Sequence, residues 1–475
     1  MKQSDSKRAY FNSADSNSVD FNSVDSNSVD SNGVDSIKTA DKTAGCPAGD
    51  SDNSMIHRDF NHENNHGNNR ENNHEDNHGN KRLKIQNCLV IGAFCLFMIG
   101  LSLVSLILPK RSFSEAENRF LQEVPEFTVD AILSGSFMKD AEDYAADHIA
   151  GRDQWVGMQA RFEEISGKGE NSGAFFADQD TLIKRVDPVS LGSLSQKINV
   201  INAFAEKVDV PVYFGLIPSP ACVWADRLPE GAAATTMDEE TAIHALYQMC
   251  DQDRVTCLNL LGMMQAHANE EIYYRTDHHW TSLGAGYGFQ ALIEAMNQRM
   301  VETSAGTSTK NAAMEMINPL DYQPVTVSDS FYGTTWSSSG AHWVKPDHID
   351  TYIQDNGNIE VLSYTDPSLD PVPNRLYHEE KLDVKDKYSY FLGGNQPICT
   401  IKTGHEGPKI LLVRDSYSDS LAPWLTERFS EITLIDFRYT RTSVSEYIAA
   451  HDYDCALILY GFSGFTTDRY MNLLQ

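Results

Sequence analysis

The stretch KILLVRDSYSDSLAPWLTERF, residues 409–429, predicts a buried strand that turns at once into a helix. Its first five residues are mostly apolar, and Leu421, Leu425 and Phe429 then recur at helical spacing. Ser416 therefore falls in the turn between strand and helix. There its hydroxyl would be exposed, and the backbone N–H groups of the first helical turn would face a developing oxyanion. The alternative is that Asp415 and Ser416 only cap the helix.

Other segments repeat this pattern of strand and helix. Residues 190–207 place apolar side chains on one helical face, and the strand-like VPVYFGLIP, 210–218, follows directly. Further short apolar strands are predicted at 255–260, 431–437 and 455–460. The alternation predicts an α/β fold, a doubly wound parallel sheet with helices on both faces. In such sheets the chemistry gathers at the carboxyl ends of the strands.

A second motif, YYRTDHHWTSLGAGYG at 273–288, supplies the groups that a serine nucleophile needs. In an extended segment Asp277 and His279 project to the same side and His278 to the other, so His279 can act as a base oriented by Asp277. Thr281 can cap the helix that follows Trp280. Two alternatives stay open: a metal site with Asp277, His278 and His279 as ligands, and a buried structural cluster.

The N-terminal part predicts a membrane anchor behind a disordered tail. The run CLVIGAFCLFMIGLSLVSLIL, 88–108, is long enough to cross a bilayer, and we expect a signal anchor over 85–108 rather than a cleaved signal peptide. Lys81, Arg82 and Lys84 precede it, which slightly favours an inside N-terminus. Residues 1–80 contain Asn, Ser, Asp and His repeats with little to bury, which predicts a solvated disordered tail. Its histidines, His62, His66, His74 and His78 among them, can alternatively bind transition metals.

The net charge and the cysteine spacing argue against particular partners and sites. The net charge of −29 argues against a nucleic-acid partner, which requires a basic face. The five cysteines after the anchor contain no CxxC pair, so their spacing indicates neither a zinc site nor a disulfide framework, although Cys250 can be bridged to Cys257.

Several motifs together resemble the DHHW family of membrane-anchored bacterial proteins. These are TDHHWTSLGAGY, FYGT at 331–334, FLGGN at 391–395, VRDSY at 413–417 and IDFRY at 435–439, together with the opening segments 113–127 and 147–153. That family is similar to the alginate O-acetyltransferase group (AlgX/AlgJ-like) of the SGNH hydrolase superfamily. The resemblance covers roughly residues 112–475. It implies an SGNH-like three-layer α/β/α sandwich with a mostly parallel sheet over 186–475, after an N-terminal stalk or subdomain at 112–185.

The resemblance also implies roles for individual residues. Ser416 would be the nucleophile, His279 the base and Asp277 its orienting acid. The segment ALILYGFSGF, 456–465, offers Gly461 and Ser463 but not the asparagine usual in an oxyanion loop, so Asn395 is a candidate instead. The remaining candidates for oxyanion or substrate binding are Tyr417, Trp280, Arg414 and Arg438. For each arginine the alternative is a surface ion pair.

The function expected from these residues is that of an anchored extracytoplasmic acyltransferase. Ser416 would receive an acetyl group and pass it to a hydroxyl of a cell-surface or secreted polysaccharide. By analogy with the group, a polytopic membrane O-acyltransferase would donate the acetyl group, and neither a metal nor another cofactor is expected. The protein would be a single-pass protein of the cell membrane with a cytoplasmic N-terminus. Two alternatives remain: a carbohydrate esterase with the same triad, and a non-catalytic glycan-binding assembly protein.

Overall fold

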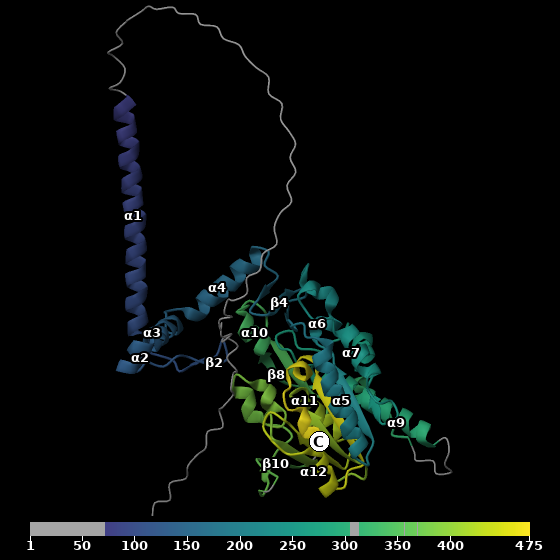
Figure 1. Cartoon of the computed structure of the whole chain (residues 1–475). Helices are drawn as coiled ribbons and strands as arrows, with labels where there is room; N and C mark the ends of the chain where they lie inside the picture. Colours follow the sequence, from purple (N-terminus) through teal and green to yellow (C-terminus); the bar gives the residue numbers. More distant parts are fainter. Residues whose placement is uncertain (1–71, 305–312, 356, 368) are drawn as a thin grey trace, which may run out of the picture. The chain divides into compact units, whose positions relative to one another are not determined.

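The computed structural model describes residues 72–304, 313–355, 357–367 and 369–475 (Figure 1). Helix α1, Asn72–Ile107, belongs to one compact unit, and residues Pro109–Gln475 form a second. Within α1, Arg82–Ile107 is long and apolar enough to cross a membrane. Helix α1 includes residues 72–80 of the predicted tail, and the disorder of the tail stays a prediction. The rest of that tail, with His62 and His66, lies outside the described residues.

The second unit begins with small elements, and the buried carboxylate of Asp147 links the first of them. They are β1 (Phe113–Ser114), β2 (Arg119–Phe120), α2 (Val129–Ser134), α3 (Ser136–Asp147) and α4 (Arg152–Ile165), followed by a three-stranded sheet of β3 (Glu170–Asn171), β4 (Ala174–Ala177) and β5 (Thr181–Lys184). The carboxylate of Asp147 pairs with Arg119 and accepts a bond from the Gln122 backbone N–H at 2.8 Å. The two opening segments of the family resemblance therefore bind each other. The division at 185/186 stays a prediction.

The main sheet has eight strands in the order β11-β10-β12-β14-β13-β15-β6-β7. Its strands are β6 (Val212–Ile217), β7 (Val255–Cys257), β10 (Glu360–Tyr364), β11 (Val372–Asn374), β12 (Ile398–Lys402), β13 (Lys409–Arg414), β14 (Glu431–Ile435) and β15 (Cys455–Gly461). The pairs from β14 to β7 are parallel, whereas β12, β10 and β11 pair antiparallel. The sheet is thus mixed rather than mostly parallel. Strands β10 and β11 were missed because they are short and only partly buried.

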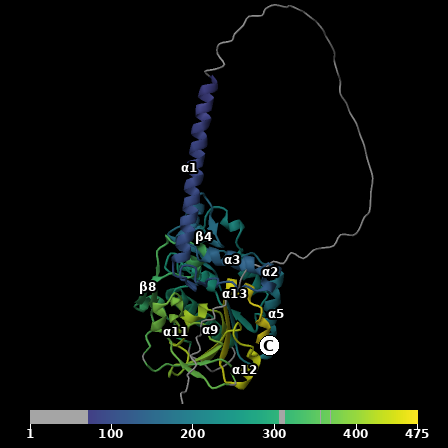
Figure 2. The same ribbon diagram turned by 90° about the vertical axis from the view of Figure 1, so that its left-hand side faces the viewer.

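Helices pack on both faces of this sheet. One core joins Leu411 and Val413 of β13 to α5 (Leu191–Lys207), α7 (Glu239–Gln248), α12 (Val444–Ala450) and α13 (Phe462–Thr467). The other joins Ile410 and Leu412 to α8 (Leu260–Ala266), α9 (Ser282–Ser304) and α11 (Tyr417–Leu425). Figure 2 shows α5 and α11 on opposite sides of the yellow strands. Alternate residues of one buried strand therefore serve two cores, as its continuous apolar run requires.

The remaining α-helices and strands of the second unit lie, along the chain, between α9 and β12 or directly after β6. They are the antiparallel pair β8 (Val325–Phe331) and β9 (Asp347–Thr351), the short helix α10 (Thr334–Ser339) and α6 (Pro220–Val223). Cys250 and Cys257 are neighbouring free thiols rather than a bridge in this structure.

Candidate active site

The site begins where β13 ends. Ser416 directly precedes α11 and lies in the turn formed by residues 414–417, called the serine turn below. Its Oγ is 2.7 Å from Nε2 of His279, which lies 137 residues earlier in the chain. The Ser416 hydroxyl is only half-buried and makes no side-chain cap on α11. The helix-capping alternative therefore does not account for Ser416.

His279 comes from a tight turn, residues 275–280, called the DHHW turn below. Tyr273 bridges Trp280 in antiparallel fashion, and the Tyr274 N–H donates to the His279 carbonyl at 3.2 Å. Inside the turn the His279 N–H donates to Asp277 Oδ1 at 3.0 Å. The side chains of Asp277 and His279 are therefore brought together by an Asx-turn and not by the extended segment expected from their spacing. The expected cap by Thr281 is present, because its Oγ1 accepts the Gly284 N–H at 3.2 Å.

Asp277 is held by donors on both of its oxygens. Oδ1 is 2.5 Å from His279 Nδ1, while Oδ2 accepts the N–H and the hydroxyl of Thr334 at 2.6 and 2.8 Å. Burial alone would raise the pKa of Asp277, but His278, His279 and these hydrogen bonds hold that pKa well below its ordinary value. A Cβ on Gly333 would lie 2.3 Å from the Asp277 Cβ, so only glycine permits this approach. The close approach of Gly333 to Asp277 thus explains the glycine of the FYGT motif.

His278 does not point away from the pair, contrary to the extended-strand expectation. Its ring centre lies 3.9 Å from that of His279, and its Nδ1 is 3.0 Å from Thr334 Oγ1. Because the Thr334 hydroxyl donates to Asp277, His278 Nδ1 must be the donor to Thr334. Burial and the neighbouring His279 hold the pKa of His278 well below its usual value. A neutral His278 therefore keeps Nε2 as an acceptor.

Three aromatic side chains fix the position of the catalytic candidates. The Tyr388 ring stacks on His279 with 4.1 Å between centres, and its hydroxyl donates to the Ser416 carbonyl at 3.1 Å. Tyr417 donates its hydroxyl to the His278 carbonyl, and Trp280 donates Nε1 to the Tyr417 carbonyl at 2.8 Å. Trp280 is fully buried, so the predicted substrate contact is corrected to a structural one. Tyr388, between motifs, carried no sequence signal.

Asp415 occupies two backbone donors that were predicted to stabilise an oxyanion. Its carboxylate accepts the Tyr417 N–H at 3.1 Å and the Gly461 N–H at 2.8 Å. Neither N–H is free for a substrate, which corrects the predicted roles of Tyr417 and Gly461 as donors. Burial raises the pKa of Asp415 to about 6, although Arg438 and the two N–H groups oppose that rise.

The two arginines have different environments. Arg414 is completely buried and pairs with Asp419 at 2.7 Å, so neither the predicted ligand-binding role nor the surface ion pair applies. Arg438 pairs with buried Asp436 at 2.6 Å but keeps 42% of its side chain exposed. Asn395 joins them, since its Oδ1 accepts from both guanidinium groups at 2.9 Å.

A cavity of about 260 Å³ opens beside Ser416. His278, Arg438 and Ser463 line it with Ser416, and Lys184 and Tyr470 form part of its wall. Of the predicted oxyanion or substrate-binding residues, Arg438, Ser463 and Tyr417 therefore line the space next to the serine hydroxyl.

In the metal-site alternative, the ligand atoms are ones that already take part in hydrogen bonds. Asp277, His278 and His279 each offer a ligand atom within 4.8 Å of the others. Both nitrogens of His279 and both oxygens of Asp277 already take part in hydrogen bonds within the site. A metal ion bound to His279 would displace the hydrogen bond to Asp277 or the one to Ser416, whereas the triad uses both. The hydrogen bonds therefore favour the triad.

A serine, a histidine and an aspartate in hydrogen-bonded series at the edge of an α/β sheet are the arrangement of serine-dependent acyl-transfer enzymes. Residues 192–435, just over half of the chain, match the family model described as DHHW protein. The chain therefore belongs to the DHHW family.

Relatives agree with this fold. A DHHW family protein from Eubacterium siraeum has a TM-score of 0.51 and 21% identity over 63% of this chain and 97% of that one. Bacillus cereus PatB1, solved with a sulfonyl adduct, has a TM-score of 0.50 and 18% identity over 62% and 96%. In sequence, the chain is 25% identical over 156 residues to the probable alginate O-acetylase AlgJ of Pseudomonas putida. That match covers 32% of this chain and about a third, 34%, of AlgJ.

Proposed function

We propose that the protein is an SGNH-like O-acetyltransferase that modifies a cell-surface or secreted polysaccharide. The observation that carries the proposal is the continuous path of hydrogen bonds from Asp277 through His279 to Ser416. The match to a probable alginate O-acetylase supports an acetyl group as the cargo and a polysaccharide as the acceptor.

In the first half of the reaction His279 Nε2 takes the Ser416 proton while Oγ attacks the acetyl carbonyl of the donor. The tetrahedral intermediate collapses to an acetyl ester on Ser416, and His279 returns the proton to the leaving group. In the second half an acceptor hydroxyl gives its proton to His279 and attacks the acetyl ester. The oxygen of Ser416 leaves and regains the proton.

The surrounding residues support both halves. Asp277, kept ionised by its neighbours, stabilises the imidazolium and fixes Nδ1–H of His279 toward itself. Arg438 and Ser463, which line the cavity, are the side chains we propose as donors to the oxyanion or to the acceptor. Nε2 of neutral His278 can accept a bond from an acceptor hydroxyl.

We also propose that α1 anchors the protein with its N-terminus inside and Pro109–Gln475 outside. Acetyl-CoA is cytosolic, so the acetyl group would be relayed by a polytopic membrane O-acyltransferase. Protease added to intact cells should digest the region after Lys110 and spare the N-terminal tail. Cleavage of the tail with protection of the C-terminal part would contradict this orientation.

The reaction is tested with the full chain in detergent, 4-nitrophenyl acetate as donor and a purified polysaccharide as acceptor. We expect new acetyl esters on the polysaccharide, detected by NMR, that require Ser416. Release of acetate alone would identify an esterase. Absence of any Ser416-dependent turnover would leave a glycan-binding protein.

A further inference from the structure

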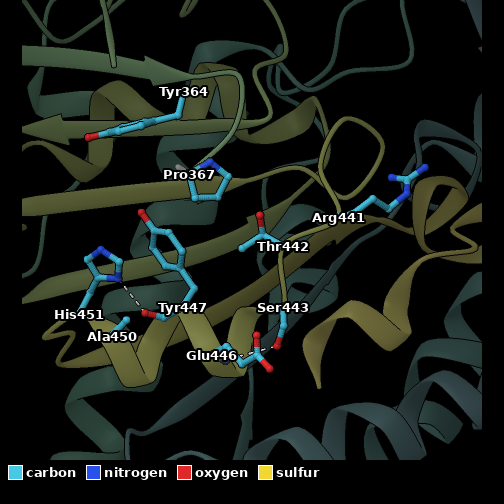
Figure 3. A pocket seen from close by; sticks show the side chains of 9 residues that line it. All are labelled: Tyr364, Pro367, Arg441, Thr442, Ser443, Glu446, Tyr447, Ala450 and His451. Atoms are coloured by element: carbon cyan, nitrogen blue, oxygen red, sulfur yellow. Dashed lines mark hydrogen bonds between the residues drawn. The ribbon is translucent and has the colours of Figure 1, made fainter. Parts of the chain in front are cut away.

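A second cavity, of about 430 Å³, lies beside helix α12. Figure 3 shows Tyr364 and Pro367 on one side, Tyr447 and His451 of the α12 region opposite them, and Arg441 at one end. Its volume falls within the range of about 300–1,000 Å³ that is typical of ligand pockets. None of its lining residues belongs to the triad.

The second cavity continues the edge of the sheet that carries Ser416. Arg438 of the Ser416 cavity and Arg441 of the second cavity lie on the same loop after β14. The Arg441 guanidinium packs over the Tyr470 ring, 4.2 Å from its centre, and Tyr470 lines the Ser416 cavity. The two cavities are therefore neighbours, because a lining residue of one packs against a lining residue of the other.

Strand pairing supports the same continuity from the opposite wall. Tyr364 is the last residue of β10 and pairs with Ile398, which in turn pairs with Ile435 at the end of β14. Tyr364 therefore lies near the loop that carries both arginines. The path from Ser416 to Tyr364 runs across neighbouring strands β13, β14, β12 and β10.

The lining suits a sugar chain better than an apolar or a highly charged ligand. Tyr364 and Tyr447 present ring surface, and Tyr447 stacks on His451 with 4.3 Å between centres. Arg441 and Glu446 carry opposite charges, and Ser443 adds a hydroxyl. Aromatic rings pack against the C–H faces of a pyranose, while polar groups pair with its hydroxyls.

We propose that the second cavity is a distal subsite that holds the acceptor polysaccharide several sugars away from the acetylated hydroxyl. This inference rests on the proposed function for the identity of its ligand, an extended glycan. A chain that spans both cavities is positioned at Ser416 by contacts remote from the reacting hydroxyl, so long acceptors bind more tightly than short ones.

The test measures glycan binding without turnover, in the full chain carrying Ser416→Ala. Alginate and cellulose oligosaccharides of increasing length serve as anionic and neutral probes in titration calorimetry. Ala450 is exposed and lines the second cavity, so Ala450→Trp fills the cavity without disturbing the core. We expect affinity to rise with length for at least one series, and Ala450→Trp to weaken the longest oligosaccharide at least tenfold.

The matched control is Ala449→Trp, because Ala449 is exposed on the same helix but does not line the cavity. It should change affinity less than twofold. Tyr364→Ala should weaken binding and Tyr364→Phe should largely restore it if ring stacking is responsible. Affinity that is absent in both series, independent of length, or equal in the two tryptophan variants overturns the subsite.

A separate measurement distinguishes this failure from failure of the proposed function. With Ser416 intact, Ala450→Trp should cleave 4-nitrophenyl acetate at the rate of the unsubstituted protein, because the second cavity does not contact the triad. Loss of Ser416-dependent cleavage in the unsubstituted protein would reject the acyl-transfer function, while the binding data would still decide the subsite.

Discussion

The DHHW turn and the serine turn each bury one aspartate beside the same histidine and serine, yet the two carboxylates differ in ionisation. Asp277 has two histidine neighbours and accepts the Thr334 backbone N–H, and these groups hold its pKa well below the ordinary value. Asp415 has mainly two backbone N–H partners, and burial raises its pKa to about 6.

The difference indicates a division of work between the two turns. Two carboxylates with similar burial have opposite pKa shifts because Asp277 is hydrogen-bonded to His279 and adjoins His278. Asp415 is hydrogen-bonded to neutral backbone N–H groups, and the charges of Arg438 and His279 do not offset its burial. Asp277 is thus suited to stabilise a protonated His279 during the reaction. Asp415 instead ties the end of β13 to the end of β15, where Gly461 lies, and so positions Ser416.

The largest effect is expected from Ser416→Ala. Loss of the nucleophile should lower acetyl transfer by about 10⁴–10⁶, as in other serine enzymes, with an unchanged melting temperature. Assays with EDTA should show no loss of activity. If EDTA inactivates the protein and Ser416→Ala does not, the DHHW turn is a metal site and the comparison of the two turns fails.

The next effect separates the two aspartates. Asp277→Asn should lower kcat by about 10⁴, because the amide no longer stabilises the imidazolium or selects the Nδ1–H tautomer. Asp415→Asn is the matched control and should lower kcat by only about tenfold to a hundredfold. Equal losses of kcat in the two variants would show that both carboxylates do the same work.

Removal of the side-chain hydrogen bond from Thr334 to Asp277 should lower kcat by about tenfold to a hundredfold. Thr334→Val removes the hydroxyl that donates to Asp277 Oδ2 at 2.8 Å but keeps the backbone bond. Thr334→Ser keeps the hydroxyl and should retain most of the activity. If Thr334→Val is as active as Thr334→Ser, the Thr334 hydroxyl does not contribute to catalysis.

Stability should respond to pH with opposite signs at the two turns. Because the folded pKa of Asp415 is raised, its contribution is present below about pH 4 and is lost as pH rises through about 6. Asp277, with a lowered folded pKa, contributes above about pH 4 and loses its contribution on acidification.

Urea unfolding between pH 4 and 7 measures the first of these contributions. The unsubstituted protein should lose about 1–3 kcal/mol more than Asp415→Asn over this range, since the other carboxyls are common to both. The same pH dependence in both proteins would contradict the raised pKa.

The smallest effect is expected from His278→Ala. About a quarter of the His278 side chain is exposed, so the loss of stability should stay below about 1 kcal/mol. The KM for the acceptor should rise several-fold with little change in kcat, because His278 lines the cavity without touching the Ser416 hydroxyl. A large loss of stability in His278→Ala would instead indicate that His278 has a purely structural role.

The sequence predicted those parts of the molecule that depend on local patterns. The apolar run 409–413 and the spacing after it located Ser416 at a strand end, and the helix at 190–207 is α5. The strands at 210–218, 431–437 and 455–460 correspond to β6, β14 and β15. The sheet order and its antiparallel half could not be predicted, because they depend on which distant strands pair, as β12 does with β14, and local patterns do not reveal those pairings.

Contacts between distant residues were beyond the reach of local patterns. Thr334 lies 57 residues from Asp277, and no periodicity links the two. Tyr388 approaches His279 and Ser416 from the turn Lys387–Tyr390, and the FLGGN motif that follows bends sharply, since its Leu392, Gly393 and Gly394 all have positive φ. Tyr417 and Gly461 looked like oxyanion donors because their position on the chain does not reveal that Asp415 occupies their N–H groups.

The central claim is that Ser416 carries the acetyl group, and trapping that ester tests it most directly. The full chain is mixed with 4-nitrophenyl acetate, quenched in acid within its first turnover and digested for mass spectrometry. We predict that the peptide containing Ser416 gains the mass of one acetyl group, with fragmentation assigning it to Ser416, and that Asp277→Asn accumulates far less. An acetyl group that appears on another residue, or equally in Ser416→Ala, would contradict the account.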